Sequence, residues 1–111
     1  MYIIIYMKNN SLSRKVKIPP AVNRNLVTMG EQIKLARMRR NFTVNLIAAR
    51  AGISRATLWK VEKGDAGVAI GIYAKVLAAI GLPNDITLLA KDDELGHFLQ
   101  DAALLNKGKR K

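Results

Sequence analysis

The segment from Ile47 to Gly64, with the sequence IAARAGISRATLWKVEKG, constrains the fold of this chain more than any other segment. Two short helices that meet at a steep angle need a small residue where they approach most closely, and a residue that accepts a positive φ in the turn. Ala48 meets the first need and Gly52 the second. Thr43 is a fair N-cap for the helix Val44 to Ala51, and Ser54 is a natural N-cap for the helix that follows Gly52. The segment therefore predicts two helices joined by a tight turn.

The two faces of this segment differ in character. The residues that point inward at helical spacing are apolar, namely Ile47, Ala51, Ile53, Leu58 and Val61. At about 100° per residue, Ala56, Lys60 and Lys63 lie on the opposite face, with Arg55 at its N-terminal end. An ordinary helical hairpin needs the same apolar spacing but not this basic face. The pattern favours a helix-turn-helix that enters a groove of DNA.

The charge of the chain is concentrated around this segment. Residues 1–63 carry 13 Lys and Arg against two acidic residues, a balance of +11. Residues 64–106 have a balance of −4, and the last five residues add +4, so the net charge is +11. A basic surface of this kind attracts a polyanion by displacing its counterions. A basic surface that serves only solubility is the lesser interpretation.

Length and composition limit the remaining function classes. At 111 residues, half of them apolar, the chain is long enough for one domain with extensions. The absence of Cys fits a reducing cytoplasm and excludes disulfides, thiolate zinc fingers and a cysteine nucleophile. With one His, and acidic residues at helix ends, we expect no enzyme, no metal site and no cofactor. The acidic run Asp92 to Glu94 is interpreted as helix-start charge.

The N-terminal residues are expected to form an arm. Met1 to Met7 is apolar but too short to span a membrane, and it lacks the features of a signal peptide. It is an edge strand, a tail that packs on a partner, or sequence upstream of a start at Met7. Asn9 to Pro20 is polar and basic, and either enters a minor groove or is a solvated leader. We expect a cytoplasmic, nucleoid-associated protein without membrane contact.

The periodicity predicts an all-α fold divided into an arm (1–20), a DNA-binding domain (21–90) and a C-terminal helix with a basic tail (91–111). The expected helices are Ala21 to about Arg40, Val44 to Ala51, the helix capped by Ser54, Ala69 to Ile80, Asp85 to Ala90, and Asp93 to Ala103. Gly30 costs the first helix about 1 kcal/mol relative to Ala, or splits it. The terminal NKGKRK is expected to be flexible.

Apolar stripes give the expected core. The first helix offers Val22, Leu26, Met29, Ile33 and Ala36; the fourth offers Ile70, Tyr73, Ala74, Leu77 and Ile80; the last offers Leu95, Phe98, Leu99 and Ala102. We interpret Trp59 as partly packed in the core, with a phosphate contact or support of the arm as the alternative. His97 is expected at the surface.

A short helix cannot bury three large apolar residues by itself. Ile86, Leu88 and Leu89 are therefore predicted to form a dimer contact, with the last helix contributing. Two recognition helices would then read half-sites about one turn of DNA apart, roughly 34 Å.

The stretch GEQIKLARMRRNFTVNLIAARAGISRATLWKVEKG resembles the five-helix lambda-repressor-like domain of the XRE family, and the resemblance covers about Met29 to Leu89. It implies an ion pair between Arg37 and Glu62. It also implies base reading by Arg55, Ala56 and Lys60. Many members begin the second helix with a phosphate-binding Gln, and here that place is Val44. Thr43 and Asn45 offer a hydroxyl and an amide near that place. The predicted phosphate contacts are Thr43, Asn45, Ser54, Thr57, Lys63 and Arg40.

The flanking segments IPPAVNRNLVTMGEQI, GDAGVAIGIYAKVLAAIGL and DDELGHFLQD resemble small HipB-type antitoxins. This resemblance implies a homodimer that binds operator DNA, represses its own operon and partners a HipA-like kinase toxin. Two alternatives stay open. The chain is a stand-alone or phage-type XRE repressor, or a protein-binding kinase inhibitor for which DNA binding is secondary.

Overall fold

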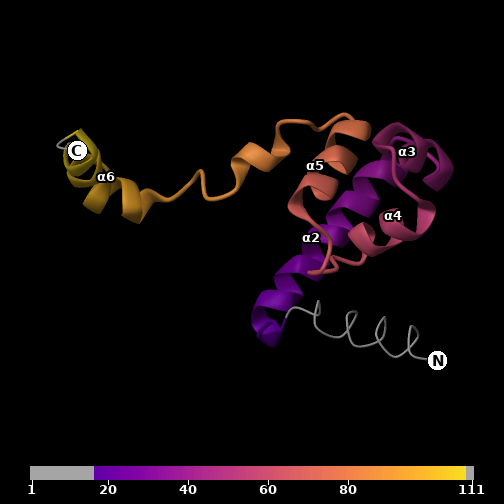
Figure 1. The fold of residues 1–111 in the computed structure, drawn as a ribbon, viewed down its shortest axis with the longest axis horizontal. Coiled ribbons are helices and arrows are strands. Elements are labelled where there is room, and N and C mark those ends of the chain that lie inside the picture. The colour runs from indigo at the N-terminus through magenta and orange to yellow at the C-terminus, as the bar shows by residue number, and fades with distance from the viewer. Residues whose placement is uncertain (1–16, 110–111) are drawn as a thin grey trace, which may run out of the picture.

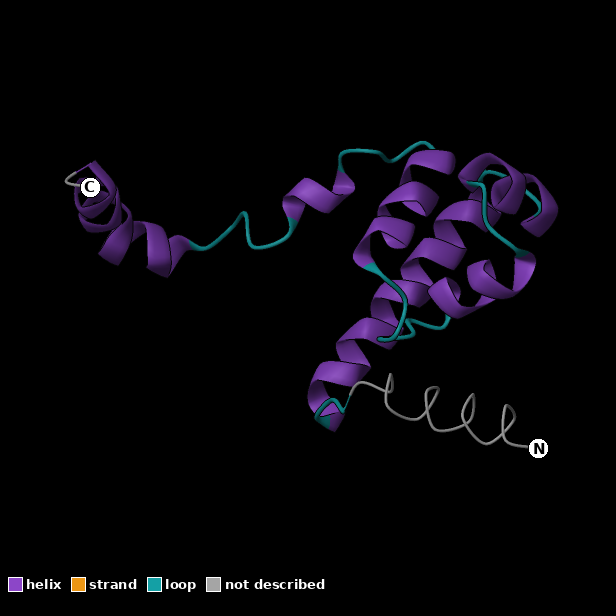
Figure 2. Cartoon of the chain, viewed as in Figure 1, coloured by secondary structure: helices purple, strands orange, loops and turns teal. Residues whose placement is uncertain are grey.

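The computed structural model describes residues 17–109, and within that range every regular element is a helix (Figures 1 and 2). The elements are α2 (Pro20–Arg39), α3 (Val44–Ala51), α4 (Arg55–Glu62), α5 (Ile70–Ala79), the 3-10 turn η1 (Asp85–Leu88) and α6 (Glu94–Lys109). The predicted all-α, lambda-repressor-like fold class is confirmed. Helices α2 to α5 form the globular part, with η1 as the shortened fifth helix.

Helix α2 extends at its N-terminal end beyond the other helices of the domain. Pro20 occupies its first turn, where a missing N–H costs nothing, and the helix continues without a break through Gly30. The prediction of one long helix is therefore confirmed and the alternative of a split is wrong. Its expected apolar stripe is buried only in the C-terminal half, at Ile33 and Ala36. Val22 is exposed, because the first turns of α2 extend beyond the helices that cover the rest.

The helix-turn-helix unit is built as the local signals predict. The Thr43 hydroxyl accepts the Leu46 N–H to cap α3, and the Ser54 hydroxyl accepts the Thr57 N–H to cap α4. Gly52 ends α3 in the left-handed region, with φ 67° and ψ 37°. Two caps and one left-handed glycine thus set the directions of both helices.

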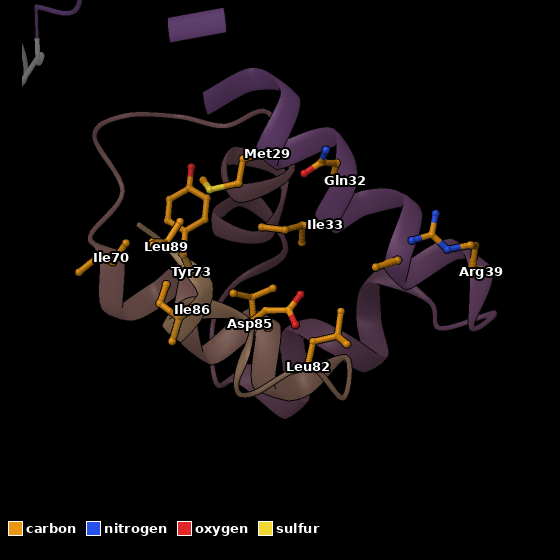
Figure 3. A pocket seen from close by; sticks show the side chains of 12 residues that line it. Met29, Gln32, Ile33, Arg39, Ile70, Tyr73, Leu82, Asp85, Ile86 and Leu89 are labelled. Atoms are coloured by element: carbon orange, nitrogen blue, oxygen red, sulfur yellow. The ribbon is translucent and has the colours of Figure 1, made fainter. Parts of the chain in front are cut away.

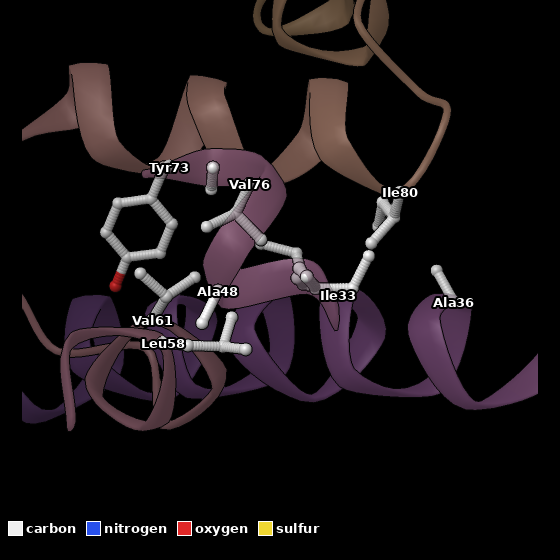
Figure 4. Packing of buried hydrophobic residues seen from close by; sticks show 10 residues of the cluster. Ile33, Ala36, Ala48, Leu58, Val61, Tyr73, Val76 and Ile80 are labelled. Atoms are coloured by element: carbon white, nitrogen blue, oxygen red, sulfur yellow. The ribbon is translucent and has the colours of Figure 1, made fainter. Parts of the chain in front are cut away.

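One hydrophobic core joins α2, α3, α4 and α5, and Figure 4 shows α5 facing α2 across it. The core consists of Ile33, Ala36, Ile47, Ala48, Ala51, Leu58, Val61, Tyr73, Val76 and Ile80. Of the inward residues predicted for the helix-turn-helix, all except Ile53 belong to this cluster, and Ile53 packs against it. Around this core α4 packs against the long helix α2, and α3 packs against α5 and α4.

Helix α5 departs from its expected stripe at its first residue. Tyr73 and Ile80 are buried as predicted, whereas Ile70 is 63% exposed. The interior position that the prediction missed is Val76, which is completely buried. Ile70 starts the helix, so its side chain lies at the edge of the covered surface and not within it.

The chain beyond α5 differs most from expectation. Gly81 follows α5 with a φ of 94°, and the expected helix Asp85 to Ala90 is only the single turn η1, with Ala90 at a φ of 59°. A helix of one turn has too few hydrogen bonds to offset the cost of starting it, so it does not extend further. The last helix runs to Lys109, beyond the predicted end at Ala103. The expectation that NKGKRK is flexible is wrong as far as Lys109, because the Ala- and Leu-rich stretch before it favours continued helix.

The predictions for residues 1–16, including the apolar tip and most of the basic arm, lie outside the described residues. Within the described range, none of the helices combines the length and the apolar character needed to cross a membrane.

Candidate nucleic-acid interface

Helix α4 presents a polar face to solvent opposite its buried face. Leu58, Val61 and Glu62 are buried against the core, whereas Arg55, Ala56 and Lys60 are exposed. Because a helix turns by about 100° per residue, these three residues share one side and the N-terminal end of α4. The structure thus brings the three sequence-predicted base-reading residues together on one accessible surface.

The N-termini of α3 and α4 add donors beside this face. Thr43 uses its oxygen to cap α3 at 3.1 Å from the Leu46 nitrogen, which leaves its hydroxyl hydrogen free to donate. The Ser54 and Thr57 hydroxyls share one hydrogen bond of 3.0 Å, so one hydroxyl hydrogen of the pair remains free. The positive ends of two helices and these hydroxyls form a suitable surface for phosphate oxygens.

The one carboxylate of α4, that of Glu62, is paired with a cation inside the protein. Glu62 and Arg37 meet in a bidentate ion pair, with Arg37 Nε 2.7 Å from Oε2 and Nη2 3.1 Å from Oε1. Both residues are buried: Arg37 is 8% exposed and Glu62 is 9% exposed. The Arg37 Nη1 group also donates to the Phe42 carbonyl oxygen at 3.0 Å. The pair that the resemblance implies is therefore present, and it connects α2, α4 and the loop before α3.

The surface around α3 and α4 is consequently basic. From Arg39 to Lys63 the chain carries six Lys and Arg residues and one carboxylate, which is the paired Glu62. Arg40 is exposed and its Nη1 donates to the Ala36 carbonyl oxygen at 2.9 Å, while Asn45 is exposed without a described side-chain bond. Val44 is exposed at the start of α3. A polyanion would meet attraction over this whole surface.

The family model described as "Helix-turn-helix domain" matches residues 28–88, which is more than half of the chain. This chain belongs to the helix-turn-helix domain family. The match assigns it to DNA-binding proteins of the helix-turn-helix type, and it ends at Leu88, before α6. No curated protein and no solved structure matches the chain significantly.

Trp59 lies on the flank of the helix-turn-helix, and its environment differs from the predicted one. Its side chain is 62% exposed, so the interpretation as partial core packing is wrong. The Lys63 ammonium group lies 4.9 Å from the centre of the indole ring, a cation–π arrangement. The indole lines a shallow hollow together with Val27, Glu31 and Lys34 of α2. It lies outside the core because α2 and α4 touch through their backbones and leave no space for a ring between them.

That backbone contact is a feature that the sequence reasoning missed. A Cβ atom on Gly30 would lie 2.8 Å from the carbonyl oxygens of both Val61 and Glu62, and a Cβ on Gly64 would meet the Leu26 carbonyl oxygen. Gly64 also has a φ of 71°. A glycine in the middle of an otherwise good helix was the available signal, since such a residue often marks a close approach.

The remaining polar side chains of the described residues do not form a second site. Arg50 stacks over the Phe42 ring at 4.8 Å and donates to the Ala79 carbonyl oxygen, so it serves the packing of α3 on α5. His97 is at the surface, as predicted, with Asp101 3.7 Å away. Among the described residues, no group of three or more His, Cys, Asp and Glu could hold a metal ion.

The predicted dimer-contact residues lie around an open apolar groove between α2, α5 and η1 (Figure 3). Ile86 and Leu89 line this groove, and Leu88 and Leu89 are exposed. We call it the α2–α5 groove. It has a volume of about 470 Å³ and its apolar lining includes Met29, Ile33, Ile70, Leu77, Ile86 and Leu89.

Proposed function

We propose that this protein is a sequence-specific transcriptional repressor that reads its operator with α4. The observation that supports this most strongly is the exposed face of Arg55, Ala56 and Lys60, within a segment (residues 39–63) whose one carboxylate, Glu62, is paired with Arg37. A segment with this excess of positive charge can approach the phosphates that border a groove. A helix of eight residues is enough to reach three or four bases.

Each residue of this face has a distinct chemical role. The Arg55 guanidinium can donate two hydrogen bonds to the O6 and N7 atoms of guanine, which discriminates by about 1 to 3 kcal/mol. Lys60 is a point donor of lower specificity, and the Ala56 methyl group can touch a thymine methyl. The phosphate contacts in this proposal are Thr43, Asn45, Ser54, Thr57, Lys63 and Arg40.

Selection of bound duplexes, followed by Arg55→Ala, tests the assignment. We expect Arg55→Ala to weaken binding to the selected duplex about 5- to 150-fold and to flatten the preference at one base pair. Binding to a random duplex at low salt should change little. Arg24→Ala is the matched control, because Arg24 is an exposed Arg on the first turns of α2. Equal losses on both duplexes would contradict base reading by Arg55.

We further propose that the repressor acts as a homodimer. A single α4 covers too few base pairs to specify a site, and a two-fold pair would read half-sites roughly 34 Å apart. Exposed Leu88 and Leu89, with Ile86, provide apolar surface for the contact. Sedimentation at micromolar concentration, with and without selected duplex, measures the state. A monomer under both conditions would overturn the proposal.

The biological setting that we propose is that of a HipB-type antitoxin, cytoplasmic and bound to the nucleoid, which represses the operon of a HipA-like kinase toxin. The support is the likeness of the segments that flank the helix-turn-helix. Deletion of residues 106–111, followed by operator binding and pull-down with the kinase encoded beside the gene, tests it. Loss of kinase binding alone makes this segment a docking element. If the full chain does not bind the kinase, the protein is a stand-alone repressor. If it binds the kinase but no operator DNA, it is a kinase inhibitor.

A further inference from the structure

Helix α6 exposes an apolar face that no other described part of the chain covers. Leu95, Phe98 and Leu99 follow helical spacing, and they are 69%, 86% and 57% exposed. The side-chain contacts described for α6 are local: the Gly96 N–H donates to Asp93 Oδ1, and His97 lies beside Asp101. A contiguous apolar stripe on an exposed helix marks a surface that packs on a partner.

The α2–α5 groove is the complementary surface. Its lining is mainly apolar and reaches the core residues Ile33, Ala36 and Tyr73, with α2, α5 and η1 as its walls (Figure 3). Its polar rim consists of Gln32 and Arg39 on α2 and Asp85 at the start of η1. Nothing in the described part of the chain fills it.

Charge favours the same pairing. Residues 17–91 carry twelve basic and four acidic residues, whereas residues 92–106 carry four acidic residues and no Lys or Arg. The acidic residues of the second segment stand at Asp92, Asp93, Glu94 and Asp101. Arg39 at the groove rim offers one opposite charge to this segment, and Asp85 faces it with a like charge. Four basic residues follow at 107–111, so the acidic part of the segment is the part that carries Leu95, Phe98 and Leu99. That part would meet a domain of positive net charge.

The connection between groove and helix decides which copy supplies α6. Leu89 is itself part of the groove wall, and only Ala90 to Asp93 separate it from the start of α6. Ala90 has a φ of 59°, and the chain after it leads away from the domain (Figure 1). For Phe98 to enter its own groove, the chain would have to turn back at Ala90 to Asp93, whereas in the structure it leads away there.

We propose that α6 of one copy docks in the α2–α5 groove of a second copy, with Leu95, Phe98 and Leu99 as the inserted side chains. This requires no reversal of the connection, and the reciprocal exchange closes as a two-fold dimer. The inference rests on the dimer of the proposed function and specifies how it is made. It assigns a role to the segment that lies beyond the matched helix-turn-helix domain.

Disulfide trapping tests the exchange directly, because the natural chain contains no Cys. A full-length Phe98→Cys chain is mixed with a tagged Ile70→Cys chain and oxidised without DNA. We expect the mixed dimer as the main cross-linked product, since only neighbouring Cα atoms can be bridged. The matched pair uses Gln100→Cys, which lies about 200° from Phe98 around α6, and should cross-link far less.

Two outcomes of the trapping experiment would overturn the exchange. One is the absence of a mixed dimer. The other is a double variant, Ile70→Cys with Phe98→Cys, that closes an internal disulfide as a dilute monomer, because α6 would then fill its own groove.

Sedimentation equilibrium provides an independent measurement. Phe98→Asp should raise the dimer dissociation constant at least about tenfold, because it places a charge where a large apolar side chain is buried. Gln100→Asp adds the same charge to the opposite face and should leave the constant unchanged. An unchanged constant for Phe98→Asp would contradict the proposal. Base preference of Phe98→Asp on a half-site duplex separately tests DNA reading, so that failure of the exchange and failure of the repressor function can be distinguished.

Discussion

Removal of the Glu62 carboxylate would leave the Arg37 guanidinium charged inside the protein with one remaining acceptor, the Phe42 carbonyl oxygen. Breaking a buried pair from one side costs about 3 to 5 kcal/mol. For Glu62→Ala we expect the midpoint of thermal unfolding to fall by at least about 10 °C, measured by circular dichroism. Glu31→Ala removes an exposed carboxylate from α2 and should change stability by less than about 0.5 kcal/mol. Equal melting curves for Glu62→Ala and the unaltered chain would show that the pair does not stabilise the fold.

Tyr73 makes the stability of the domain sensitive to alkaline pH. Its hydroxyl donates to the Asp65 carbonyl oxygen at 2.7 Å. Burial, reinforced by the Asp65 carboxylate, raises the pKa of Tyr73 to about 12, whereas the unfolded chain has a value near 10. The stabilisation is therefore complete below pH 10 and is lost as the pH rises from about 10 through 12.

The measurement for Tyr73 is the urea midpoint of the unaltered chain and of Tyr73→Phe between pH 9 and pH 12. We expect the unaltered chain to be more stable by about 1 kcal/mol at pH 9, because of the hydroxyl bond, and to lose this advantage toward pH 12. A difference that stays constant over the whole range would exclude titration of Tyr73 as its cause.

Single-residue roles were predictable where the determinant is local. Thr43, Ser54 and Gly52 act through bonds and dihedral angles within four residues, so the sequence predicts them correctly. Trp59 and Ile70 were assigned to the wrong environment, because their exposure depends on how closely a distant helix approaches. Helical period alone does not contain that distance.

At the scale of helices, the crossing of α2 and α4 depends on the two glycines of their contact. Gly30→Ala would improve helix propensity by about 1 kcal/mol in an isolated helix. In the protein its Cβ would meet the Val61 and Glu62 carbonyl oxygens at 2.8 Å, so we expect a net loss of stability. Gly71→Ala in α5 is the matched control, because its Cβ would meet nothing within 4 Å, and it should stabilise by about 0.5 to 1 kcal/mol. Urea denaturation of both variants measures the difference, and stabilisation by both would exclude the close contact.

The helices themselves followed from periodicity and end signals, and those of the helix-turn-helix agree with their predicted limits to within one residue. The same reasoning overestimated η1 and placed the end of α6 too early. Both elements lie outside the compact core, where no neighbouring helix fixes the length. Packing, which a sequence pattern describes only indirectly, is what sharpens helix limits.

At the scale of the whole molecule, the salt dependence of DNA binding counts the protomers that bind. Each neutralised phosphate contributes about 0.9 to the slope of log K against log salt concentration. If Lys63 binds one phosphate in each protomer, Lys63→Ala should lower the slope by about 1.8 for a dimer and about 0.9 for a monomer. Lys91→Ala, beyond η1, should leave it unchanged. An unaltered slope for Lys63→Ala would remove Lys63 from the phosphate contacts.

The quaternary arrangement is the feature that could be predicted least from the sequence. Exposed leucines after α5 indicated a contact surface, and the groove that they border became visible only with the positions of α2 and α5. The basic face, by contrast, was evident from residue order alone, because it lies on one short helix.

The glycine contact and the ion pair also fix the rotational phase of α2 relative to α4. The first turns of α2 continue as one rigid rod beyond the domain, so the direction in which the preceding chain leaves is set by the number of residues between Pro20 and Gly30. One residue inserted in these turns would rotate that exit by about 100°, and four would restore it to within about 40°. The length of this rod therefore determines the direction, relative to α4, in which the chain enters the domain at Pro20.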